Sequence, residues 1–145
     1  MSIRRVAAVL SLSLALAARA GAQSPEYLGG DGARYPFTPV VKVGRMLYLS
    51  GQIGTDSSRT VVAGGIRAET RQALTNIRAL LEKNGGSMDH VVKCTVFMAD
   101  MSEWATMNEV YVTFFPRHLP ARSAFGATAL ALGARTEIEC LGTVK

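Results

Sequence analysis

Three absences narrow the functions open to this 145-residue chain. Its two histidines, His90 and His118, and its two cysteines form no cluster with the spacing of metal ligands. Lysine and arginine form no cluster with interleaved aromatic residues, which is the pattern of a nucleic-acid surface. The apolar run near the N-terminus is shorter than the about 20 residues of a membrane-spanning helix. We therefore expect no metal site, no nucleic-acid partner and no transmembrane segment.

What is present at the N-terminus has the pattern of a secretory signal. Arg4 and Arg5 precede an apolar run over residues 6–18, and small-residue cleavage sites follow, the last of them ending at Ala22. We therefore expect a periplasmic or secreted protein that leaves the membrane once the signal is cleaved. An uncleaved interfacial anchor is the alternative.

Cleavage after Ala22 defines the organisation of the chain. It removes residues 1–22 with three arginines, which lowers the formal net charge from +5 to +2. Residues 23–34 lack periodicity and are expected to be a flexible lead-in. Residues 35–145 suffice for one domain with one core.

The periodicity of apolar residues in this domain predicts an α+β fold. The order is β-β-α-β-α-β-β, with both helices on one face of a mixed sheet. Because residues 46–53 and 91–98 are apolar on both faces, the other sheet face should also be buried, as in a symmetric oligomer that packs sheet to sheet. The expected elements are a hairpin over 40–43 and 46–53, a helix over 66–84, a strand over 91–98, a helix over 102–115, and strands over 122–130 and 135–144.

The C-terminal segment contains the residues best suited to chemistry. Arg122 begins one predicted strand, and Glu137 and Glu139 share a face of the next. Two strands joined by a short turn can form an antiparallel pair, which would bring the guanidinium and a carboxylate to one pocket. A cation for a substrate carboxylate and an acid that handles water suit chemistry on a small 2-keto or 2-imino acid. The alternative is a structural arginine paired with one of the two glutamates.

Both cysteines fall on the core-facing side of predicted strands. Cys94 is in phase with Val92 and Val96, and Cys140 with Ile138. An exported protein can form disulfides. We nevertheless favour two buried free thiols, because a bridge requires close Cα atoms.

Five segments of the domain resemble the YjgF/Rid family, the reactive-intermediate imine/enamine deaminases. The family fold is similar to that of trimeric chorismate mutase, with active sites in clefts between subunits. The resemblance therefore implies a homotrimer with intersubunit sites. The segments, in order, are PFTPVVKVGRMLYLSGQIG, NIRALLEKNGGSMDHVVKCTVFMADM, WATMNEVYVTFF, PARSAFG and TEIEC.

The resemblance implies hydrolysis of a 2-imino acid, the tautomer of a 2-enamino acid, to a 2-keto acid and ammonia. No cofactor is required, because water adds to an electrophilic carbon. Arg122 would bind the substrate carboxylate through a bidentate fork, and Glu137 would assist water. Ser50 and Gly51 would line the pocket, with Asn108 beside it. The alternative hypothesis is a non-catalytic trimer that binds a small carboxylate. A third, less favoured hypothesis is a ribonuclease or translation inhibitor.

Two positions depart from the family's pattern. Phe37 stands where the best-known members have a pocket tyrosine, and Ala124 stands where they have a cysteine. Loss of a hydroxyl removes a hydrogen-bond partner, and loss of a thiol reshapes the pocket. In the second helix, Trp104 and Tyr111 are expected in the core.

Overall fold

The structure is a computed structural model that describes residues 23–29 and 36–145. The predicted signal segment and part of the predicted lead-in lie outside these ranges. Within them, no helix is long and apolar enough to cross a membrane. The same ranges contain no group of three or more His, Cys, Asp or Glu residues that could hold a metal ion.

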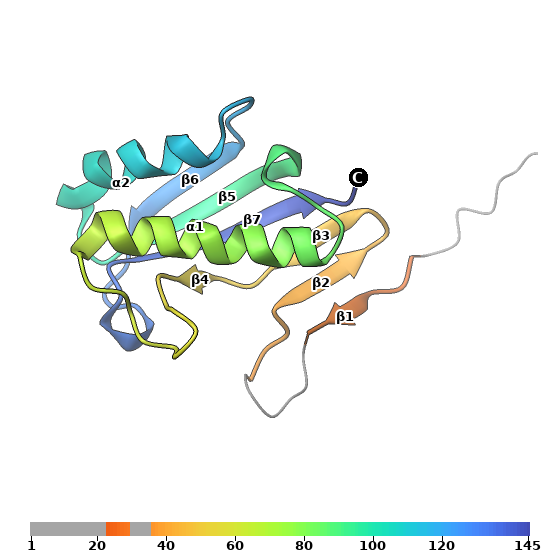
Figure 1. The fold of residues 1–145 in the computed structure, drawn as a ribbon, viewed down its shortest axis with the longest axis horizontal. Coiled ribbons are helices and arrows are strands. Elements are labelled where there is room, and N and C mark those ends of the chain that lie inside the picture. The colour runs from red at the N-terminus through yellow and green to blue at the C-terminus, as the bar shows by residue number, and fades with distance from the viewer. Residues whose placement is uncertain (1–22, 30–35) are drawn as a thin grey trace, which may run out of the picture.

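A seven-stranded mixed sheet forms one layer of the domain (Figure 1). The strand order is β1-β2-β3-β7-β5-β6, and β4 pairs separately with β7. All pairs are antiparallel except β5 with β6. The strands are β1 (Glu26–Leu28), β2 (Val40–Val43), β3 (Met46–Leu49), β4 (Gln52–Ile53), β5 (Val91–Met98), β6 (Ala121–Gly126) and β7 (Thr136–Thr143).

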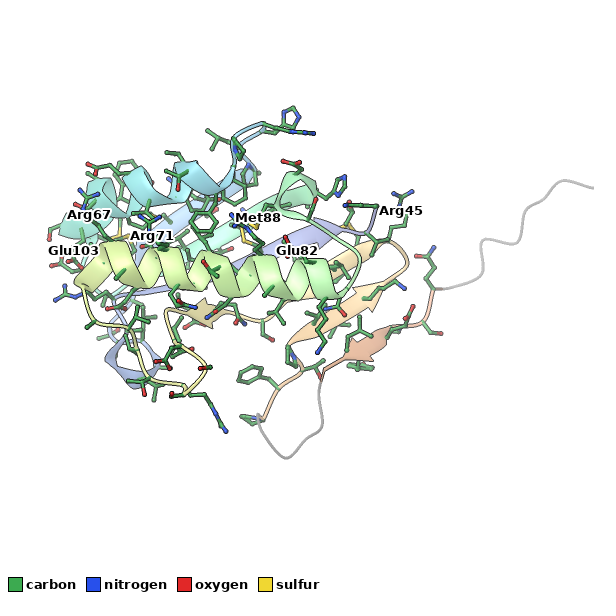
Figure 2. All side chains as sticks on the ribbon, viewed as in Figure 1. Arg45, Arg67, Arg71, Glu82, Met88 and Glu103 are labelled. Carbon is green, nitrogen blue, oxygen red and sulfur yellow. A yellow bond between two sulfur atoms is a disulfide. The ribbon has the colours of Figure 1, made fainter. Side chains whose placement is uncertain are left out.

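Two α-helices form the second layer and cover one face of the sheet, which confirms the predicted fold class (Figure 1). The predicted apolar stripe of α1, with Leu74, Ile77 and Leu81, is fully buried. A salt bridge between Arg67 and Glu109 joins the two helices at the end of the layer where Figure 2 labels Arg67. The helices are α1 (Gly65–Lys83) and α2 (Trp104–Tyr111), with 3-10 turns η1 (Met88–His90), η2 (Met101–Glu103), η3 (Val112–Phe114) and η4 (Ala131–Gly133).

The two C-terminal strands do not form the antiparallel pair that we expected from their closeness in the chain. β5 lies between β6 and β7, pairing in parallel with β6 and antiparallel with β7. β7 thus occupies the middle of the sheet, where it pairs with β3, β4 and β5. The expectation was wrong because the order of strands in a sheet depends on non-local pairing.

The predicted second strand of the hairpin is broken at Ser50 and Gly51. The segment from Tyr48 to Gln52 is one residue longer than the segment of β7 from Ile138 to Leu141 that it opposes. This extra residue is a β-bulge between β3 and β4. Bulges of this kind change the direction in which side chains project, and they recur beside functional sites.

Cys94 and Cys140 form a disulfide, so the expectation of two free thiols was wrong. The residues are directly paired across β5 and β7, and their Cα atoms are 4.1 Å apart. Both are buried, as predicted. Their closeness follows from the register of two strands whose cysteines are 46 positions apart, which spacing in the sequence does not reveal.

Candidate functional site

A cavity of about 630 Å³ opens beside the break between β3 and β4. Four of the predicted site residues line it: Phe37, Ser50, Gly51 and Glu137. Apolar side chains contribute much of the remaining wall, including Ile53, Leu80 and Leu132 together with Phe37.

Gly51 leaves room for the carboxylate of Glu137. A β-carbon at position 51 would lie 2.8 Å from Cδ of Glu137 and closer still to Oε1. Real Cβ atoms essentially never make such contacts, so a side chain at Gly51 would displace the carboxylate. The sequence contains a glycine here because another group approaches the backbone closely.

Ser50 holds the chain segment that contains Phe37. Its hydroxyl donates to the Thr38 carbonyl at 2.7 Å, and its amide donates to the Pro39 carbonyl at 2.9 Å. Gln52 Nε2 donates to the carbonyls of Ser50 and Gly51, both at 3.0 Å. These bonds satisfy backbone groups that the broken strand leaves without a ladder partner. Ser50 thus shapes the cavity through the backbone.

The setting of Glu137 is less favourable to a charged carboxylate than water is. Burial raises the pKa of the Glu137 carboxyl, and the negative charge of Glu139 raises it further. A carboxylate with a raised pKa is a better proton acceptor, and its acid form persists to higher pH. Glu137 is therefore suited to exchange protons with water.

Arg122 belongs to a second group of residues, beside α2. Its guanidinium carbon lies 4.6 Å from the ring centroid of Tyr111 and 6.0 Å from that of Trp104. In the described part of the chain, no hydrogen bond or ion pair engages this guanidinium, so the alternative pairing with Glu137 or Glu139 is not formed. Its N–H donors are thus available to an anion.

Two further polar atoms in this group lack partners. Asn108 Oδ1 and the Tyr111 hydroxyl are buried and make no hydrogen bond within the described residues. Burial raises the pKa of Tyr111 to about 12, although the nearby Arg122 charge acts in the opposite direction. The hydroxyl therefore stays protonated at neutral pH. Buried polar groups without partners are costly, and they are satisfied when a ligand or water binds.

The two groups lie on opposite faces of the sheet. Arg122 is paired with Cys94, which packs under the helices, whereas Glu137 is paired with Phe97, three positions further along β5. Residues an odd number of positions apart on a strand point to opposite faces. β5 also separates the two strands. One chain therefore does not bring Arg122 and Glu137 to a common pocket, contrary to our expectation.

The remaining predictions met mixed outcomes. Ala124 lies on the helix-facing side of β6 with Arg122 and packs against the core. Tyr111 is buried as predicted, but Trp104 is 43% exposed beside Arg122 rather than in the core. Arg59 and Leu132 line the Glu137 cavity and were not predicted. Both have positive φ, Arg59 in a loop and Leu132 within the 3-10 turn η4, a feature that no periodicity reveals.

Comparison with known proteins identifies the family. The family model described as Endoribonuclease L-PSP matches residues 32–144, and this chain belongs to that family. A protein of Mus musculus named 2-iminobutanoate/2-iminopropanoate deaminase is 45% identical over 107 residues, which cover 73% of this chain and 79% of the relative. The Homo sapiens protein of the same name is 43% identical over 111 residues, covering 76% and 81%.

A solved structure also resembles the whole domain. The crystal structure of the YjgF gene product from E. coli has a TM-score of 0.73 and 32% sequence identity, and the match covers 78% of this chain and 91% of that one. The resemblance inferred from the five sequence segments is thus confirmed at the level of family and fold.

Proposed function

We propose that this protein hydrolyses small 2-imino acids, and their 2-enamino tautomers, to 2-keto acids and ammonia. The observation that carries the proposal is the Arg122 guanidinium, which is partly buried and has no anionic partner among the described residues. A planar fork of N–H donors suits a substrate carboxylate. The relatives named as imino-acid deaminases support this choice of substrate.

In the proposed reaction, Glu137 accepts a proton from water while the water oxygen bonds to the C=N carbon. The substrate nitrogen takes up protons, the C–N bond breaks and ammonia leaves, and the carbonyl of the 2-keto acid remains. The nitrogen gains two protons: Glu137 returns the one it took from water, and the hydroxyl group of the adduct loses the other as the carbonyl forms, so the protons balance. The raised pKa of Glu137 supports both of its proton transfers. Arg122 contributes by holding the substrate in position.

We also propose a homotrimer in which each site lies between two subunits. One subunit would supply Arg122, Ala124 and Asn108, and its neighbour would supply the cavity around Glu137. The opposite orientation of the two groups supports this arrangement, because a substrate that contacts both needs a second chain. The sheet face without helices supports it too, since its aromatic side chains Tyr48 and Phe125 are 44% and 47% exposed.

Export to an oxidising compartment is a further part of the proposal. The predicted signal in residues 1–22 and the disulfide between Cys94 and Cys140 support it, because disulfides persist mainly outside the cytosol. Mass measurement of the native secreted protein would reveal cleavage, the disulfide and the oligomer together. An uncleaved protein with two free thiols would contradict export.

The test of function is a coupled assay in which an amino-acid oxidase generates 2-iminobutanoate in the presence of the protein. Wild type should accelerate 2-oxobutanoate formation above the uncatalysed rate, and Arg122→Ala should lose most of that gain. Arg71→Ala, at an exposed position on α1, is the matched control. If wild type adds nothing while 2-oxobutanoate still raises its melting temperature, the protein is a carboxylate binder. RNA cleavage that persists in Arg122→Ala would point to a contaminant or to a separate activity.

A further inference from the structure

The guanidinium of the partly buried Arg122 lies beside two aromatic rings and has no oxygen partner among the described residues. Some other arginines of the fold pair with oxygen atoms, such as Arg135 with Glu103 at 2.7 Å, whereas the exposed Arg78 stacks on the Phe114 ring at 4.7 Å. Arg122 contacts the rings of Tyr111 and Trp104. An oxygen partner occupies N–H donors and, when anionic, offsets the positive charge, whereas an aromatic face does neither.

The two rings come from one face of α2. Trp104 and Tyr111 are seven positions apart, which is close to two turns, so their side chains project from the same side of the helix. Tyr111 is 2% exposed and its ring also packs against Phe115, with centroids 4.8 Å apart. Its position is therefore fixed by packing. Trp104 is 43% exposed and flanks the guanidinium at a greater distance.

We propose that Tyr111 is a positioning residue of the carboxylate site: its ring, assisted by Trp104, holds the Arg122 guanidinium in place while leaving every N–H donor free for the substrate. This inference rests on the proposed function, which supplies the carboxylate. A preorganised guanidinium loses less side-chain entropy when the substrate binds. The effect should therefore fall on binding more than on the chemical step.

Three variants test the role of the ring. Tyr111→Leu removes it, and KM for 2-iminobutanoate should rise by about 5- to 30-fold, the range expected of a partly desolvated cation–π contact. Tyr111→Phe keeps the ring but loses the buried hydroxyl, so its KM should rise less than that of Tyr111→Leu. Phe114→Leu is the matched control, because it removes a ring of similar burial that contacts Arg78 at 4.7 Å. Its KM should equal that of wild type.

A second readout does not depend on catalysis. Ring currents should shift the Arg122 side-chain proton resonances upfield in wild type and in Tyr111→Phe, and this shift should be lost in Tyr111→Leu. The resonances are assigned by their absence from Arg122→Lys. If no imino acid is hydrolysed but the shifts behave as described, the proposed function fails and the positioning by Tyr111 stands.

Three results would overturn the inference. The first is an unchanged KM in folded Tyr111→Leu, and the second is a KM in Tyr111→Phe as high as that in Tyr111→Leu. The third is an Arg122 side-chain proton shift that is the same in wild type and in Tyr111→Leu. If Tyr111→Leu does not fold, Trp104→Leu, at an exposed position, replaces it in the KM test. It should raise KM by at least about 2-fold, and no change would likewise overturn the inference.

Discussion

The carboxylate of Glu137 lies against the Cα atom of Gly51, in space that a β-carbon would otherwise fill. The contact joins the bulge between β3 and β4 to the central strand β7. It also fixes where the carboxylate sits relative to the cavity. The geometry of the proposed acid–base group thus depends on a residue with no side chain.

Gly51→Ala should therefore reduce kcat at least about 10-fold, because Glu137 must rotate away from the position in which it meets water. The fold should survive, since the end of a flexible side chain can move. Gly126→Ala is the control, because its β-carbon would contact the flexible Met101 side chain at 3.3 Å. Initial rates and circular dichroism of both variants check this. Normal activity in Gly51→Ala would show that the position of Glu137 does not matter.

Arg122→Ala and Glu137→Gln should each be nearly inactive, yet a mixture of the two should recover activity. If every site combines Arg122 of one subunit with Glu137 of its neighbour, random exchange in a 1:1 mixture restores about a quarter of the sites. The two variants are unfolded together, refolded and assayed. As the control, each variant is unfolded, refolded and assayed alone. Failure to recover activity, when mass measurement shows mixed oligomers, would contradict intersubunit sites.

The sequence predicted the features that depend on residues close together in the chain, but not those that depend on pairing between distant strands. The strand Val91–Met98 and the helix ending near Lys83 follow from local periodicity and match the structure closely. The partners of β6 and β7 and the disulfide depend on strand order, which local patterns do not encode.

In the candidate site, too, local features were predicted and long-range arrangements were not. Gly51 was predicted from the resemblance to the family, which rests on a local sequence segment. The separation of Arg122 from Glu137 was not predicted, because it requires both the strand order and the parity of positions along β5. Trp104 was misplaced because it is the first residue of α2, where an apolar residue in phase with the stripe can still be exposed.

Glu139→Gln should shift the acid limb of the pH profile of kcat/KM to lower pH. Burial contributes most to the raised pKa of Glu137, and the negative charge of Glu139 contributes less. Removing the Glu139 charge therefore lowers the pKa of Glu137. If Glu137 acts as a carboxylate, activity is lost as pH falls through its pKa, so the variant stays active in more acidic solution. Glu82→Gln, at an exposed position on α1, should leave the profile unchanged. A shift toward higher pH would contradict the proposed role of Glu137.

Cys94→Ala combined with Cys140→Ala should lower the free energy of unfolding by about 2–4 kcal/mol, because the bridge restricts the unfolded chain. The two cysteines are 46 positions apart, so the closed loop is long. Thermal unfolding of wild type refolded with and without reductant provides the comparison. Reduced wild type should approach the double variant, whose own melting temperature should not respond to reductant. Because Cys94 is paired with Arg122 in the next strand, the double variant should also show whether the bridge affects substrate binding. Equal stability of oxidised and reduced wild type would mean that strand pairing alone fixes β5 against β7.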